Sequence, residues 1–144
     1  MYTGLKHFHS YWAYLVVLTL AVALVNALVG LLGNQTFNAR DRRFTLFALI
    51  AAHLQFVFGL ILYFVSPVGL SNLNGSTMKD SAARLYALEH PLTMIIVIAL
   101  VTIGYSRAKR SGEDKRRFRT VAVTYSLAFV LMMSRIPWNA WLGR

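Results

Sequence analysis

Four long apolar stretches constrain the fold of this chain more than any other feature of its sequence. They cover residues 11–33, 44–66, 86–106 and 120–138. The hydrocarbon core of a bilayer is about 30 Å thick, and a helix of roughly 20 residues crosses it. Because lipid offers no hydrogen-bond partner to backbone amides, we expect each stretch to be helical. The sequence therefore predicts an all-α, integral membrane four-helix bundle with up-down-up-down topology, in which residues 1–144 form one transmembrane domain.

The composition agrees with a membrane location. Hydrophobic residues make up 57% of the chain and charged residues 14%, with a mean hydropathy of +0.53. These values exclude a disordered chain and argue against a water-soluble domain. The absence of cysteine excludes disulfides, cysteine-ligated zinc or iron–sulfur centres, and covalently attached c-type haem.

The basic residues predict the orientation. The connections 34–43 and 107–119 hold ten of the 15 Lys and Arg residues. By the positive-inside rule, we expect these loops in the cytoplasm and both termini outside, in a bacterial cytoplasmic (inner) membrane. The net charge of +10 is then an orientation signal that contacts the anionic lipid bilayer, and we predict no nucleic-acid partner. The other five basic residues fall on the opposite side: Lys6, Lys79, Arg84, Arg135 and Arg144.

Histidine is the main metal-binding residue type within the apolar stretches. His53 lies near the middle of the second stretch, where a polar ring costs free energy unless it has a partner. His90 lies just inside the outer end of the third stretch, and His9 precedes the first. Two imidazoles from facing helices of a bundle can hold a haem iron between them.

Estimated depths favour one pair of ligands. At about 1.5 Å per residue, His53, His90 and His9 lie roughly 15, 24 and 36 Å from the cytoplasmic ends of their helices. On this estimate His53 and His90 differ by about 9 Å in depth, and His9 and His90 by about 12 Å. We therefore predict His53 and His90 as the metal ligands, although a haem with one histidine ligand is also open. His53 has two alternative roles, as a hydrogen-bonded structural or proton-conducting group and as a quinone contact.

A second polar cluster is expected at the outer face. Glu89 and Arg135 carry opposite charges near the outer ends of the third and fourth stretches, so an ion pair between them is expected. Alternatively, Arg135 binds the haem propionates or positions a quinone head group. The predicted cofactor-binding residues are therefore His53, His90, His9 and Arg135.

Four short motifs resemble a known family. Lys6-His7-Phe8-His9-Ser10-Tyr11-Trp12, Ala52-His53-Leu54-Gln55, Leu88-Glu89-His90-Pro91 and Arg135-Ile136-Pro137-Trp138 together look like small bacterial four-span membrane proteins labelled cytochrome b or cytochrome-b-like. The resemblance covers nearly the whole chain. It implies a b-type haem and electron transfer, with His53, His90 and His9 at the matching positions.

The functional expectation is a membrane protein that binds haem b and relays electrons, with the quinone pool or a respiratory complex as partner. Two alternatives are a non-catalytic accessory or assembly subunit and a small proton-conducting or transport protein that uses His53. Other membrane subunits, or further copies of this chain, are expected partners. No spacing of nucleophile and base indicates hydrolytic chemistry, so no catalytic residue is predicted.

Overall fold

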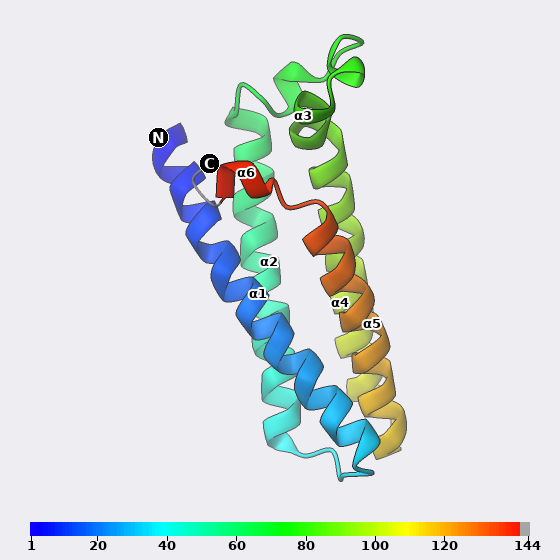
Figure 1. Ribbon diagram of the computed structural model, residues 1–144. Coiled ribbons are helices and arrows are strands. Elements are labelled where there is room, and N and C mark those ends of the chain that lie inside the picture. Colours follow the sequence, from blue (N-terminus) through cyan, green and yellow to red (C-terminus); the bar gives the residue numbers. More distant parts are fainter. Residues whose placement is uncertain (142–144) are drawn as a thin grey trace.

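The structure, a computed structural model, describes residues 1–141 and contains helices but no strand among them. Four long helices lie side by side (Figure 1). They are α1 (Tyr2–Leu32), α2 (Ala39–Val65), α4 (His90–Arg110) and α5 (Asp114–Ser134). The shorter elements are η1 (Leu70–Asn72), η2 (Thr77–Lys79), α3 (Ser81–Arg84), the π-helical η3 (Leu85–Glu89) and α6 (Trp138–Trp141).

The all-helical fold that the sequence predicts is confirmed. Within the described residues, three helical segments are long and apolar enough to cross a membrane. Helix α5 is not among them, because charged residues crowd its first two turns. The three segments are Tyr2–Leu32, Ala39–Val65 and Ser81–Arg110, the last comprising α3, η3 and α4.

The helices differ from the apolar stretches mainly at their polar ends. Helix α1 begins at Tyr2 and not at residue 11, because backbone hydrogen bonding continues through polar residues that no hydropathy pattern marks. This extension places His9 inside a helix. The fourth helix ends at Ser134, ahead of Pro137, and not at residue 138 as predicted. Arg144, which contributed to the predicted orientation, lies outside the described residues.

The packing order sets which helices face each other across the centre. Helix α1 packs on α2 and α5, and α4 packs on the same two helices. Helices α1 and α4 are therefore diagonal neighbours. Small buried side chains such as Ala23, Ala27, Ala48 and Ala51 let the helices approach closely.

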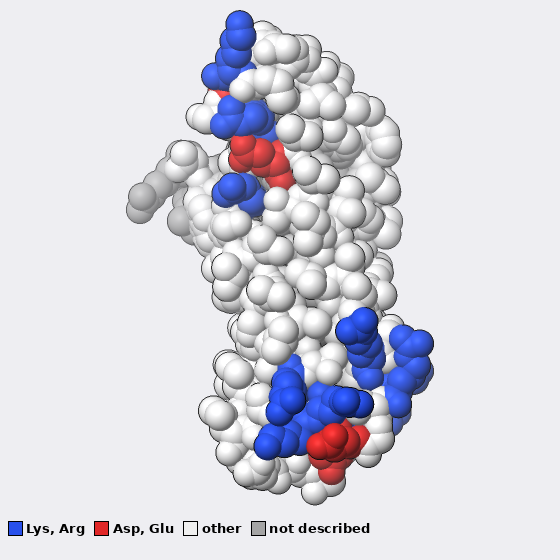
Figure 2. All heavy atoms as spheres, turned by 90° about the vertical axis from the view of Figure 1, so that its right-hand side faces the viewer, with Lys and Arg blue, Asp and Glu red and all other residues white. Residues whose placement is uncertain are grey.

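The two ends of the molecule differ in the number of cations that they carry. Ten Lys and Arg residues lie in or beside the connections at one end, and Lys6, Lys79, Arg84 and Arg135 lie toward the other. We call the end with the 33–38 and 111–113 connections the basic end, and the end with α3 and α6 the terminal end (Figure 1). Figure 2 shows Lys and Arg gathered at both ends of one face, with uncharged surface between them. Large apolar side chains are exposed on the outside of the helices, among them Val25 at 59% and Val130 at 66%.

Candidate histidine site

His9 and His90 come together at the terminal end of the molecule. They belong to the diagonally placed helices α1 and α4. Their ring centroids are 6.4 Å apart and the ring planes stand at 84°. The structure thus pairs two imidazoles from elements that are far apart in the sequence, and the pair is not the one predicted.

The His90 ring is held from the helix that follows α4. Its Nδ1 lies 2.8 Å from the backbone oxygen of Arg135, so Nδ1–H donates and the proton of the neutral ring is on Nδ1. Nε2 then carries the lone pair, and no residue among 1–141 makes a hydrogen bond to it. A backbone carbonyl at Nδ1 is the arrangement that commonly orients a metal-binding histidine.

A π-helical turn leads into His90. The five residues of η3 come directly before it, and π-turns occur often at functional sites. The hydroxyl of Tyr63 on α2 donates to the backbone oxygen of Ala87 in this turn, at 2.9 Å. Pro91 follows in the first turn of α4, where its missing N–H does little harm.

The His9 ring lies against α2. The amide nitrogen of Gln55 donates to the backbone oxygen of His9 at 2.9 Å and lies 3.4 Å from His9 Nε2. His9 Nδ1 and Gln55 Oε1 are both buried without a hydrogen-bond partner. Gly59, one turn beyond Gln55, makes room for the ring, since a Cβ there would lie 2.8 Å from His9 Cε1.

An ion group borders the histidine pair. Glu89 accepts from Arg84 Nε at 2.7 Å, and its other carboxylate oxygen lies 3.4 Å from Arg135 Nε. The pair that the sequence predicts between Glu89 and Arg135 is therefore present. The sequence did not indicate that Arg84 is the closer partner. Two guanidiniums beside one carboxylate leave a net positive charge next to His90.

His53 lies elsewhere and is not paired with His90. Its Nδ1 lies 2.8 Å from the backbone oxygen of Leu49, and its Nε2 is 3.3 Å from Thr102 Oγ1 on α4. Thr102 is twelve residues beyond His90 on the same straight run of helix, a rise of about 18 Å. That distance is too long for His53 and His90 to bind one metal ion directly.

The depth estimate ranked the pairs in the wrong order for a geometric reason. It treated the helices as parallel to one axis, whereas α1 runs obliquely across the molecule (Figure 1). An oblique helix gains less height per residue, so His9 lies closer to the level of His90 than the residue count indicates. A glycine in an apolar helix, such as Gly59, is a sequence feature that permits such a close approach, whereas Gln55 is not.

The described residues contain no cluster of three or more His, Asp or Glu side chains that would hold a metal ion. A haem iron needs only one or two protein ligands, because the porphyrin supplies four nitrogens.

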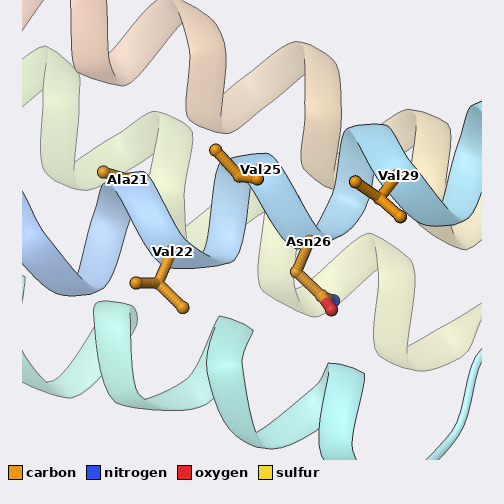
Figure 3. Close-up of a pocket in the computed structure, with 5 residues that line it drawn as sticks. All are labelled: Ala21, Val22, Val25, Asn26 and Val29. Carbon is orange, nitrogen blue, oxygen red and sulfur yellow. The ribbon is translucent and has the colours of Figure 1, made fainter.

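A groove on α1 is separate from this site. It has a volume of about 440 Å³ and is lined by Ala21, Val22, Val25, Asn26 and Val29 (Figure 3). Ala21 is twelve residues from His9, about 18 Å along the helix. The groove lining carries no histidine, and it contributes nothing to the histidine pair.

Comparison with known proteins leaves the geometry as the basis for a functional conclusion. No family model, no curated protein and no solved structure matches this chain.

Proposed function

We propose that this chain is an up-down-up-down four-helix membrane protein that binds one b-type haem through His9 and His90 and relays electrons. One observation carries the proposal. The ring centroids of two imidazoles from diagonal helices lie 6.4 Å apart, and Nε2 of His90 has no hydrogen-bond partner among the described residues.

The separation of the rings agrees with an iron between them. Two metal–nitrogen bonds of about 2.0 Å, with the distance from each nitrogen to its ring centre, place such centroids roughly 6 Å apart. Each imidazole can rotate about its own bond to the metal, so nearly perpendicular planes are compatible with ligation. When bound, the haem iron supplies one-electron chemistry by alternating between its ferric and ferrous states.

The surrounding residues have their own roles in this proposal. The backbone oxygen of Arg135 keeps the His90 proton on Nδ1 and leaves Nε2 free for the metal. The guanidiniums of Arg84 and Arg135 share the single carboxylate of Glu89, so they retain positive charge for the anionic haem propionates.

The membrane placement follows from the charges. Ten Lys and Arg residues lie in or beside the two connections of the basic end, which we place in the cytoplasm. Both termini then lie on the outer side of a bacterial inner membrane, and the haem site is near that outer surface. The uncharged surface between the two ends in Figure 2 supports this placement.

His53 has a packing role in this proposal. Its ring joins α2 to α4 through Thr102 and bonds to its own helix through Leu49. We assign His53 to packing because it contacts α4 at Thr102, about 18 Å along that helix from His90, where no second histidine of the described residues is near.

The test is an alkaline-pyridine spectrum of detergent-purified protein expressed with adequate haem supply. We expect a b-type band in the wild type, its loss in His9→Ala and His90→Ala, and its retention in His53→Ala. His7→Ala is the matched control, because His7 is an exposed imidazole two residues from His9. A colourless wild type would contradict the proposal, as would a spectrum that depends on His53 and not on His9.

A further inference from the structure

Gln55 is the residue in closest polar contact with the His9 ring. Its amide nitrogen carries two hydrogens, one of which points at the backbone oxygen of His9, 2.9 Å away. The amide cannot be turned over, because Oε1 would then face that carbonyl oxygen. The second hydrogen is therefore available to His9 Nε2, at 3.4 Å.

This contact specifies the tautomer of His9. A donor beside Nε2 requires a lone pair there, so the proton of the neutral ring is on Nδ1. The other tautomer would place two N–H groups against each other. His90 has the same tautomer, because its Nδ1–H donates to Arg135. Both rings therefore carry their lone pair on Nε2.

Two unsatisfied atoms remain beside this contact, and they are complementary. The Nδ1–H of His9 is a buried donor without an acceptor, and Oε1 of Gln55 is a buried acceptor without a donor. Leaving each of them unpaired costs about 1–3 kcal/mol. A swing of the imidazole that frees Nε2 would allow these two atoms to satisfy each other.

Gly59 lets the His9 ring lie directly against α2. A Cβ at this position would lie 2.8 Å from His9 Cε1 and 3.4 Å from Nδ1, so the ring occupies the place that a side chain would take. Gln55 and Gly59 are one helical turn apart and flank the ring on the same side.

We propose that Gln55 is a positioning residue that exchanges partners when His9 binds its ligand. Without the ligand, Gln55 donates to Nε2 and holds the lone pair that a metal requires. With the metal on Nε2, Gln55 Oε1 accepts from Nδ1–H and makes the imidazole a stronger electron donor. The first half depends on the contacts alone, and the second half rests on the proposed haem.

The first half is tested in the ligand-free protein by ¹⁵N imidazole NMR in detergent. We expect His9 as the Nδ1–H tautomer in the wild type and a larger Nε2–H fraction in Gln55→Leu. The control is Gln35→Leu, which alters an exposed glutamine at the basic end. A wild-type His9 in the Nε2–H form, or a Gln55→Leu spectrum equal to the wild type, would overturn the assignment.

The second half is tested by haem titration and by the reduction potential of the loaded protein. Gln55→Leu is expected to weaken haem binding about 10-fold, the lower end of the effect of removing a partner of a metal-binding histidine. The potential should rise in Gln55→Leu and fall in Gln55→Glu, because a carboxylate is the stronger acceptor for Nδ1–H. A glutamine with a merely structural role would leave the His9 tautomer unchanged in Gln55→Leu.

The outcomes separate the two proposals. If the wild type binds haem but the potentials of both Gln55 variants equal its own, the partner exchange is wrong and the haem proposal stands. If the wild type binds no haem while Gln55→Leu changes the His9 tautomer, the haem proposal is wrong and the ligand-free contact stands.

Discussion

The two ends of the molecule bury polar groups in opposite ways. At the basic end, Asp41 is 2% exposed and both its carboxylate oxygens accept hydrogen bonds. At the terminal end, His9 Nδ1 and Gln55 Oε1 are buried without partners. Buried polar groups in proteins are usually paired, so a paired network is the ordinary structural case and an unpaired one marks a candidate site. The comparison therefore marks the terminal end as the place of the candidate site and the basic end as a packing network.

The basic-end network joins three helices. Asp41 accepts from Asn26 on α1 at 2.9 Å and from the backbone N–H of Asn38 at 2.8 Å, and the second bond completes a capping box at the start of α2. The Thr45 hydroxyl donates to the Asp41 backbone oxygen, and the buried Tyr125 on α5 donates to the Thr45 backbone oxygen at 2.8 Å. Its three buried members, Asp41, Thr45 and Tyr125, are all hydrogen-bonded.

The largest expected effect comes from breaking the satisfied end. Asp41→Ala leaves two part-buried donors without their acceptor and removes half of the capping box, so we expect it to lower the free energy of unfolding by about 2 kcal/mol. Denaturant unfolding in detergent measures this. Asp80→Ala, which removes the exposed cap of the four-residue α3, is the control and should cost about 1 kcal/mol or less. Haem content per folded molecule should be unchanged, and a specific loss of haem would contradict the division between the ends.

The next effect separates ligand binding from stability at the terminal end. Gly59→Ala should weaken haem binding about 10-fold, which corresponds to about 1.4 kcal/mol, because the new Cβ fills the space beside His9. The same change favours an α-helix by up to about 1 kcal/mol, so the fold should not be destabilised. Haem titration and unfolding of the same preparation measure both effects. A destabilised protein with normal haem affinity would show that Gly59 serves packing alone.

A third change sharpens the account of the basic end. Tyr125→Phe keeps the buried ring and removes only its hydrogen bond to Thr45, so a loss of about 1 kcal/mol in unfolding free energy is expected. Tyr11→Phe, at a side chain that is 72% exposed, should have no measurable effect. If the two substitutions had equal effects, the hydrogen bond from Tyr125 to Thr45 would not stabilise the fold.

The smallest effect concerns His53. Thr102→Val removes the contact between α4 and His53 Nε2 and should cost about 0.6 kcal/mol, the average for polar contacts between membrane helices. Thr19→Val is matched, because both threonines bond to their own helix and only Thr102 has the additional contact with His53. If Thr102→Val lost bound haem, His53 would again be a candidate haem ligand.

The sequence predicts the helices better than it predicts the site. Apolar stretches mark where helices must form, and Asn38 with Asp41 marks one helix start correctly. The partner of His90 depends on the tilt of α1 and on which helices are diagonal, and neither is encoded by local periodicity. The role of Gln55 could not be predicted for a further reason. A single glutamine in an apolar helix does not indicate which side chain it will contact.

The sequence alone determined that this chain is helical and apolar, with cations concentrated at two connections, because these properties follow from composition and local periodicity. Only the tertiary structure decided that His9, and not His53, stands opposite His90, and that Gln55 and Gly59 flank the His9 ring. The reason is physical: helix formation depends on contacts within a few residues, whereas the meeting of two side chains eighty residues apart depends on how whole helices cross.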